Sequence, residues 1–321
     1  MEQTNAVAIK RKRRKNNGHM RNEGIGYEIF KIFNYAFMIF IILITLVPYL
    51  NVFAKAFNDA NDSMRGGITI YPRVFTTENF KILLKDPAMY QAAMVTIGRT
   101  VYSVIVNLTV QFFASYALSR KHAPGMKYFN FFFIFPGWVS SGLIANYILM
   151  SKIGLLNTFW VYVLPGTFSF YNSMIIRSYI NSNIPEEVIE SAHLDGASEV
   201  RIVFQMIMPL SLPILATISL WTAVGEWNDW RTTLYYVQTP SLHVLQYKLM
   251  QTIKESERII SLIQSAMEEG QDVEELQNQV QVTPESLQAA QVVVVTLPII
   301  CLYPFLQKYF VKGVTLGSVK G

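Results

Sequence analysis

Residue types that usually carry catalysis or bind metals are few and scattered in this sequence of 321 residues. The chain has one cysteine, Cys301, and four histidines, His19, His122, His193 and His243. The histidines lack the spacing of a metal site, and no serine or cysteine triad can be built from them. The phosphate-binding pattern G-x-x-x-x-G-K-[ST] does not occur either. We therefore expect no catalytic residue, no metal and no cofactor in this chain, and any ATP must be used elsewhere.

The most informative segment is the polar stretch 183–213, which lies between two strongly apolar ones. Pro185 followed by two glutamates is typical of a helix start, where a missing N–H costs nothing and acids are favoured. Gly196 accepts the left-handed conformation that ends helices. Ser198 can then cap a second helix. The pattern predicts two short helices joined by a tight turn.

The second of these helices carries an apolar stripe. Four apolar residues recur at i, i+3, i+4 and i+7, and they are Val200, Val203, Phe204 and Ile207. Pro209 and Pro213 then mark the entry into the next apolar segment. Two interpretations remain open, a loop packed against its own bundle and a docking element for a soluble cytoplasmic partner.

Composition indicates an all-α membrane protein. Apolar residues make up 51% of the chain and charged residues only 15%, against about 25% charged in soluble domains. Six stretches free of charge approach the roughly 20 residues that cross a bilayer. Buried helices of a large soluble protein are a poor alternative for six such runs. The predicted spans lie near residues 30–54, 92–119, 128–151, 155–180, 209–229 and 286–309.

The first span is too long for a signal peptide, and no cleavage pattern follows it, so we expect it to remain as an anchor. Basic residues in the tail 1–27 predict a cytoplasmic N-terminus. Alternation then places the C-terminus and the loop 183–208 in the cytoplasm, and the loops 55–90 and 231–285 outside. A basic tail can also bind nucleic acid. Beside a span, topology and lipid headgroups account for it, so no nucleic-acid partner is expected.

The second external loop contains an acidic stretch of helical pattern, residues 254–281. Its apolar face holds Ile259, Ile260, Ile263 and Met267. This stretch is either a solvent-exposed helical loop without a binding role or a surface that binds an extracellular partner. After it, Thr283-Pro284-Glu285 is typical of a helix start and would begin the last span.

The hairpin resembles the EAA loop of ABC importer permeases, whose pattern is E-A-A-x3-G-x9-I-x-L-P. Four positions match at the required spacing, namely Glu190, Ala192, Gly196 and Pro209. Three positions depart from the pattern, namely Ser191, Met206 and Met208. Trp227-Asn228 and the C-terminal segment 307–321 resemble the carbohydrate-uptake branch, the maltose-type inner permeases. The C-terminal segment and residues 282–286 are most similar to the polysaccharide and complex-oligosaccharide subgroup of that branch.

This resemblance implies the type I ABC importer permease fold over residues 28–321, with six spans and both termini cytoplasmic. It also implies a second homologous permease subunit, two ATPase subunits that use ATP and Mg, and an extracellular solute-binding protein. The substrate would be a carbohydrate, an oligosaccharide by subgroup, imported across a bacterial plasma membrane. The hairpin would supply the helix that couples to the ATPase. The implied coupling residues are Glu190, Ala192, Asp195, Gly196, Val203, Phe204 and Pro209.

Polar and aromatic residues within the spans are candidates for the substrate path, because polar groups are costly in lipid and usually face a cavity or another helix. Aromatic rings can stack on sugar C–H faces, and amides or acids can bind hydroxyls. The candidates are Trp138, Asn146, Tyr147, Asn172, Glu226, Trp227 and Asn228. For each of them, helix packing or an interfacial position is the competing interpretation.

Three other functions are alternatives to this one. An ABC permease for a peptide, phosphate or polyamine would carry the same hairpin. A secondary transporter would predict inverted repeats with charges at mid-span, and neither is evident. A membrane-embedded enzyme, such as a lipid-linked glycosyltransferase, would need clustered acids or histidines near the membrane surface.

Overall fold

A computed structural model describes residues 25–59, 62–63, 67–120, 124–139, 141–268 and 282–317. Within these ranges the chain is helical and forms no strand, apart from an isolated bridge between Asn58 and Phe75. The predicted all-helical fold is therefore confirmed for this part of the chain. The predictions for residues 1–24, 269–281 and 318–321 lie outside the described residues. The chain divides into two units, residues 1–50 and 51–321.

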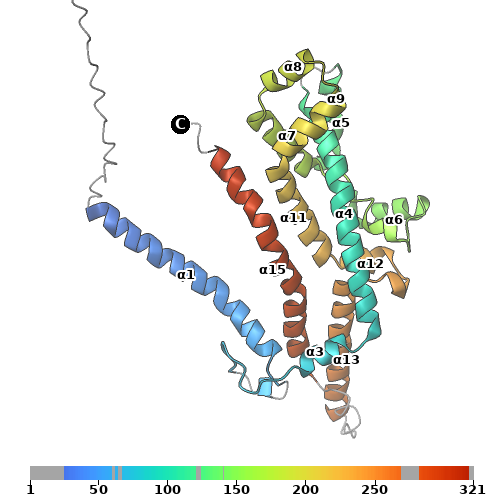
Figure 1. Ribbon diagram of the computed structural model, residues 1–321. Coiled ribbons are helices and arrows are strands. Elements are labelled where there is room, and N and C mark those ends of the chain that lie inside the picture. The colour runs from blue at the N-terminus through green and yellow to red at the C-terminus, as the bar shows by residue number, and fades with distance from the viewer. Residues whose placement is uncertain are drawn as a thin grey trace, which may run out of the picture. The chain divides into compact units, whose positions relative to one another are not determined.

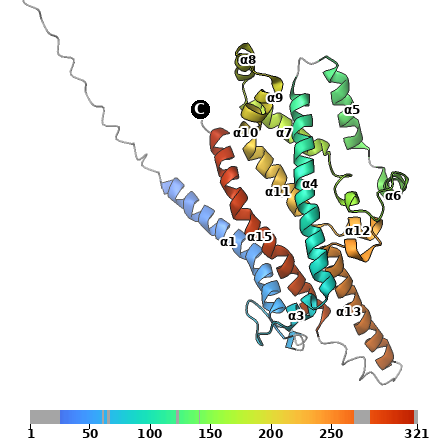
Figure 2. The same cartoon turned by 45° about the vertical axis from the view of Figure 1, so that its right-hand side comes forward.

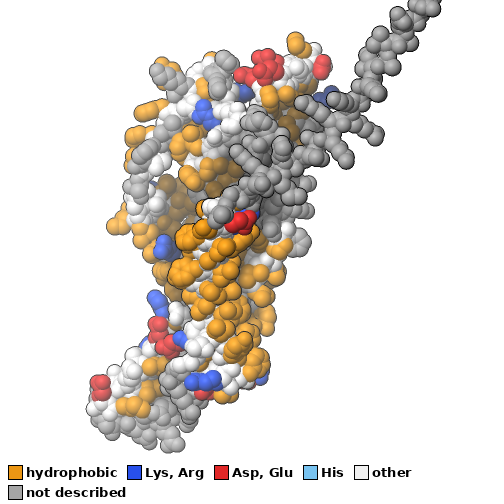
Figure 3. All heavy atoms as spheres, turned by 90° about the vertical axis from the view of Figure 1, so that its left-hand side faces the viewer, with side chains coloured by type: hydrophobic (Ala, Val, Ile, Leu, Met, Phe, Trp, Pro, Cys, Tyr) orange, Lys and Arg blue, Asp and Glu red, His pale blue; other side chains and the backbone are white. Residues whose placement is uncertain are grey.

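The first unit contains most of helix α1 (Ile25–Ala56). Its 32 residues correspond to roughly 48 Å of helix, more than the hydrocarbon core of about 30 Å. The side chains of residues 26–49 are exposed or half-buried, and most are hydrophobic. Figure 3 shows hydrophobic side chains gathered in a long patch on one face of the molecule. Such an apolar helix requires lipid or another subunit around it.

The second unit is built around α4 (Pro87–Ser119), which follows the short helix α3 (Glu78–Leu84). Helix α4 packs against α7 (Phe170–Asn183) and α11 (Leu212–Asn228), and α11 also packs against α15 (Pro284–Gly317) (Figures 1 and 2). The start of α4 is fixed by Asp86, whose side chain accepts a hydrogen bond from the Ala88 N–H at 2.9 Å. This hydrogen bond places Asp86 at the N-cap of α4, which continues as one unbroken helix to Ser119.

Three helices are long and apolar enough to cross a membrane, Gly26–Ala56, Pro87–Ser119 and Pro284–Pro304. Helix α11 qualifies only together with the arm Glu199–Leu210, from which it is bent by 74°. The described residues thus hold three such helices, or four if the bent pair counts as one span. A bend of this size takes the arm away from the direction of α11.

Two segments predicted as continuous spans are broken in the structure. The segment near 128–151 is divided between α5 (Met126–Trp138) and α6 (Gly142–Lys152), because Val139 is extended and Gly142 has a positive φ of 74°. The segment near 155–180 begins with the 3-10 turn η1 (Phe159–Tyr162) and becomes α-helical only at Phe170. Positive φ values at Gly154 and Asn157 separate it from α6. Hydropathy predicts the length of an apolar run, but it does not predict where the helix within that run is interrupted.

The loop predicted between the last two spans is mostly structured. It contains α12 (Arg231–Tyr236), η3 (Pro240–Leu242) and α13 (Leu245–Glu268). The helix predicted over 254–281 thus begins earlier, and its inner part buries Leu249 and Ile253 against α3 and α15. The predicted start of the last span is confirmed, since Thr283 Oγ1 accepts a hydrogen bond from the Ser286 N–H at 3.2 Å.

Candidate functional site

The hairpin predicted from the sequence forms as two arms around a glycine. The first arm is α8 (Glu186–Leu194), and Pro185 caps its start. Gly196 has φ +77° and donates its N–H to the His193 carbonyl at 3.0 Å. The second arm begins with α9 (Glu199–Ile202), where the Ser198 side chain accepts a bond from the Arg201 N–H at 3.4 Å. The predicted glycine turn and serine cap are therefore confirmed.

The apolar stripe predicted on the second arm is wrong in part. After α9 the backbone forms a π-helix, η2 (Val203–Ile207), followed by α10 (Met208–Leu210). The wider π turn shifts which residues face inward. Ile202, Val203 and Ile207 are buried, whereas Val200 is 67% exposed and Phe204 is 50% exposed. The Phe204 ring also contacts the edge of Phe113, with centroids 5.7 Å apart.

The hairpin is attached to the bundle by a continuous apolar core. Ile189 and Ala192 from the first arm pack with the three buried residues of the second arm. Each large apolar side chain buried in this way contributes about 1.5–3 kcal/mol. The bundle contributes residues from α4, α7 and α11, which are Phe112, Tyr116, Ile176, Ile180, Leu215 and Ile218. Motion of the hairpin must therefore displace these three helices.

A group of polar contacts, here named the Glu199 latch, reinforces this attachment. The Glu199 carboxylate accepts hydrogen bonds from Arg120 Nη2 at 2.8 and 3.0 Å and from Tyr116 Oη at 2.8 Å. His193 Nε2 lies 3.4 Å from the same carboxylate. Arg120 and Tyr116 are at the end of α4, so the latch ties both arms of the hairpin to that helix.

Protonation does not open the latch at neutral pH. Burial pushes the pKa of Glu199 up, but hydrogen bonds from Tyr116 and Arg120 and the charge of Arg120 outweigh burial and lower it. A lowered carboxyl pKa stabilises the folded state above its unfolded value of about 4.3. That contribution is lost only as the pH falls through the lower folded pKa.

Replacing Glu199 with glutamine is expected to reduce uptake by up to about fivefold, the factor that corresponds to 1 kcal/mol for a partly exposed ion pair. Uptake per ATP hydrolysed, measured in proteoliposomes, tests this expectation. Glu78→Gln, which breaks an exposed ion pair with Lys81 on α3, outside the hairpin, is the matched control. Equal uptake per ATP by Glu199→Gln and by the wild type would contradict the role of the latch.

The outward surface of the hairpin combines apolar and charged side chains. Leu194 is 89% exposed at the end of the first arm, next to the exposed residues Glu190 and Asp195. A groove of about 470 Å³ runs between the arms, and its lining includes Ser191, Ala192, Asp195, Arg201 and Gln205. Ala192 is buried, so a larger side chain there would change the spacing of the arms. Exposed apolar groups beside charges are typical of a surface that binds another protein.

Three of the predicted path residues are adjacent at the end of α11. Glu226 Oε2 lies 3.0 Å from Arg99 Nη2. Trp227 donates its indole N–H to the Val295 carbonyl at 3.1 Å, and Asn228 Oδ1 accepts a hydrogen bond from Gln246 Nε2 at 3.3 Å. All three therefore hold the bundle together at this end, whatever else they contact.

The other predicted path residues lie on different elements. Asn146 and Tyr147 are on α6, where Asn146 Oδ1 accepts from Ser141 Oγ at 2.9 Å and Tyr147 stacks on Tyr236. Asn172 is in the first turn of α7. Trp138 is the last residue of α5, and its side chain lies outside the described residues. These residues are not assembled around a single pocket in the described part of the chain.

Sequence reasoning missed a buried charge centre, here named the Arg99 cluster (Arg99, Tyr162, Glu226 and Asp229). Arg99 is 0% exposed. Its Nη2 donates to the Glu226 carbonyl at 2.6 Å and lies 3.1 Å from Asp229 Oδ2, while its guanidinium lies 4.9 Å from the Tyr162 ring centre. The cluster joins α4, η1 and the end of α11. The sequence did contain one signal for this cluster, a lone arginine at the edge of an apolar run. A charge at such a position requires partners within the protein.

Among the described residues, no group of three or more His, Cys, Asp or Glu side chains could hold a metal ion.

Comparison with known proteins places this geometry in context. The family profile described as "Binding-protein-dependent transport system inner membrane component" matches residues 112–316. The Bacillus subtilis "Protein LplC" is 33% identical over 94% of this chain and 98% of its own length. The "Polygalacturonan/rhamnogalacturonan transport system permease protein YtcP" of the same organism is 29% identical over 91% of this chain and 99% of its own length.

A solved structure has a similar fold. It is a crystal structure of a bacterial ABC transporter involved in the import of the acidic polysaccharide alginate. The matched chain is 25% identical, with a TM-score of 0.74, and the match covers 89% of this chain and 98% of the other.

Proposed function

Because this chain belongs to the family of binding-protein-dependent transport system inner membrane components, we propose that it is the permease subunit that imports an oligosaccharide. The chain is a multi-pass component of the inner membrane with the type I ABC importer permease fold. Its role is transport, and ATP is hydrolysed by another subunit. The observation that carries the proposal is the exposed hairpin 183–209, fixed to α4, α7 and α11 by its buried face.

In the proposed topology six spans cross the membrane and both termini are cytoplasmic. Helices α1, α4, α11 and α15 account for four of them. The broken segments α5–α6 and η1–α7 account for the other two. Non-helical backbone at membrane depth is tolerated where it is buried in protein or lines an aqueous cavity, and this requirement fits segments that border a substrate path.

Coupling follows from the way the hairpin is attached. We propose that two ATPase subunits bind below the membrane and that one of them receives α8 and the turn at Gly196 in a surface groove. Glu190 and Asp195 supply exposed charge, and Leu194 and Val200 supply exposed apolar contact. When ATP closes the ATPase pair, the displaced hairpin carries α4, α7 and α11 with it. Access then changes from one side to the other as packed helices shift.

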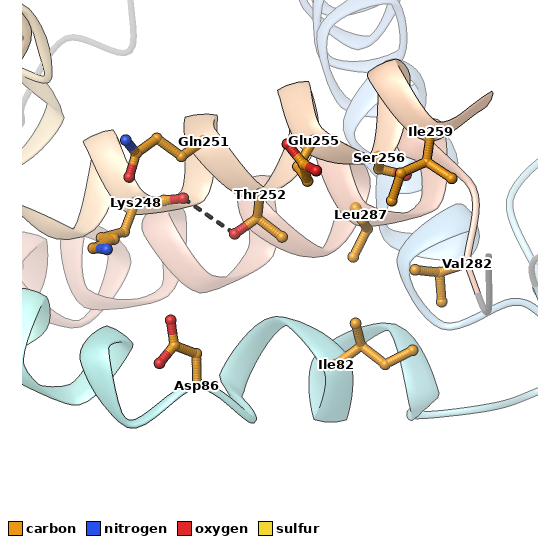
Figure 4. Close-up of a pocket in the computed structure, with 10 residues that line it drawn as sticks. All are labelled: Ile82, Asp86, Lys248, Gln251, Thr252, Glu255, Ser256, Ile259, Val282 and Leu287. Atoms are coloured by element: carbon orange, nitrogen blue, oxygen red, sulfur yellow. Dashed lines mark hydrogen bonds between the residues drawn. The ribbon is translucent and has the colours of Figure 1, made fainter. Parts of the chain in front are cut away.

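The remaining partners are a second permease and an extracellular binding protein. On the side assigned to the exterior, a groove of about 530 Å³ lies between α13 and the start of α4. Figure 4 shows Lys248, Thr252 and Glu255 of α13 on one side of it and Ile82 and Asp86 on the other. We propose that the binding protein contacts this rim and the segment 254–281. Charges of both signs on its wall, together with exposed α13 side chains, support a protein contact.

An oligosaccharide cargo is supported by the relatives. YtcP is described as a polygalacturonan and rhamnogalacturonan permease, and the structural neighbour takes part in alginate import. Alginate is described as an acidic polysaccharide. A non-sugar solute is the second candidate, because the hairpin itself carries no information about cargo.

Reconstitution of this chain with its partner permease, ATPase and binding protein tests the proposal. Labelled oligosaccharides should accumulate inside the proteoliposomes only when both ATP and the binding protein are supplied. Uptake of amino acids, phosphate or polyamines should stay at the background of vesicles that lack ATP. Import of one of these solutes without import of any oligosaccharide would overturn the cargo assignment.

A further inference from the structure

A second open pocket lies at the end of α11 that the proposed topology places outside. Its volume is about 430 Å³, and α13 and the start of α15 form its other walls. It is separate from the groove of Figure 4 and is here named the amide pocket. Its polar and aromatic lining consists of Asn228, Trp230, Gln246, Lys254, Glu257, Gln288 and Gln291.

The amides of this pocket are held in fixed orientations by one another. Gln291 Nε2 donates to Gln246 Oε1 at 3.1 Å, and Gln246 Nε2 donates to Asn228 Oδ1 at 3.3 Å. Asn228 Nδ2 in turn donates to the Val224 carbonyl at 2.9 Å, which anchors the series on α11. Gln246 is only 8% exposed, so it sits behind the other side chains. The result is a preorganised polar wall that joins three helices.

Such a wall has unused hydrogen-bonding capacity. Each side-chain amide has two donor hydrogens and an oxygen with two lone pairs. The hydrogen bonds of Gln246 described above use one hydrogen and one lone pair, and those of Asn228 do the same. Gln288 is exposed on the same face of α15, one helical turn before Gln291. The pocket therefore presents donors and acceptors side by side.

We infer that the amide pocket binds a sugar residue of the oligosaccharide at the outer mouth of the permease, an inference that rests on the proposed function. A sugar hydroxyl both donates and accepts, so amides that offer both groups complement it. The Trp230 indole offers a flat apolar face for the C–H side of a sugar ring. Lys254 at the rim can bind a hydroxyl or a uronate carboxylate. The volume lies within the range of small-molecule sites.

The location of the pocket supports a role in substrate entry. Asn228, a lining residue, directly follows Glu226 and Trp227, which lie on the segment that sequence analysis assigned to the substrate path. Two neutral hydrogen bonds or a comparable stacking contact correspond to a change of about tenfold in affinity. A first contact at the mouth would hold one end of the chain while the next residues enter.

The test uses the variant Gln288→Leu/Trp230→Ala, because neither side chain belongs to the hydrogen-bonded series described above. The whole transporter, with partner permease and ATPases in lipid nanodiscs and without binding protein, is titrated with labelled galactotriose and with labelled trigalacturonate. We expect the Kd of at least one probe to rise about tenfold. The control variant, Gln264→Leu/Tyr71→Ala, removes an exposed amide and an exposed aromatic ring outside the pocket and should leave Kd unchanged.

Two results would overturn the inference, an unchanged Kd for both probes and no binding of either probe to the wild type. If the Kd is unchanged and a separate titration shows that the variant binds the solute-binding protein more weakly, the pocket is a protein contact. Uptake by the wild type is measured in parallel. If the wild type imports oligosaccharides and the variant binds both probes with unchanged Kd, only this inference fails. If the wild type imports no oligosaccharide, the proposed function fails.

Discussion

Replacing Gly196 with proline is expected to abolish substrate uptake by the assembled transporter while its permease core remains folded. Proline fixes φ near −65°, whereas the turn requires +77°. The substitution also removes the N–H that bonds to the His193 carbonyl at 3.0 Å. A strain above about 1.4 kcal/mol already depopulates the native turn tenfold. The arms would then meet at a different angle, and α8 would no longer fit its partner.

The measurement is uptake and ATP hydrolysis in the same proteoliposomes, together with retention of the ATPase during purification. Gly196→Asn is the matched control, because asparagine tolerates the left-handed region and no other atom lies within 4 Å of a Cβ added at this position. Asparagine should retain most of the uptake and proline should retain less than a tenth. Equal uptake by the two variants would contradict the role of the turn.

Replacing Arg99 with methionine is expected to have the largest effect on stability. The substitution leaves the half-buried carboxylates of Glu226 and Asp229 without their buried cationic partner. Breaking a fully buried pair from one side costs about 3–5 kcal/mol, and the partial exposure of these carboxylates lowers that cost. We expect the purified variant to unfold at a lower temperature and to lose the contacts of α11 first. Thermal unfolding in detergent, monitored by tryptophan fluorescence, measures this change.

A triple variant separates charge from packing in this cluster. Arg99→Met/Glu226→Gln/Asp229→Asn removes all three charges, so no uncompensated carboxylate remains. It should recover at least half of the loss in unfolding temperature, since replacing all members of a buried ionic group is often neutral or stabilising. If the triple variant were as unstable as Arg99→Met alone, the carboxylates would not be the reason for the loss.

Local sequence rules predicted the hairpin well because each of its features is a short-range effect. Gly196 adopts the left-handed conformation, Ser198 caps the second arm, and Thr283 caps the last helix. Each depends on a residue and its nearest neighbours along the chain. The composition likewise predicted an all-helical membrane protein, since hydropathy sums over many residues and tolerates local errors.

Features that depend on distant contacts could not be predicted in this way. Phe204 lies in the π turn Val203–Ile207 and is exposed, and Val200 on the preceding α9 is exposed as well, although an ideal helical period places both on the buried face. The breaks at Val139 and at residues 153–158 interrupt runs that contain no charged residue. Glu226 was predicted only as a candidate for the substrate path, and its pairing with Arg99, which is 127 positions away in the sequence, was not predicted. Only the folded chain brings those two residues together.

The central claim is that an ATPase in trans drives this chain through the hairpin 183–209. A single cysteine at Leu194, introduced after Cys301→Ser, tests it directly, because Leu194 is the most exposed hydrophobic side chain of the hairpin. With a short thiol cross-linker and a cysteine series along the ATPase groove, Leu194→Cys should cross-link to the ATPase with a yield that changes when ATP is added. Tyr71→Cys, on the first external loop, should give no such product. Failure of Leu194→Cys to cross-link in a transporter that retains uptake would contradict the claim.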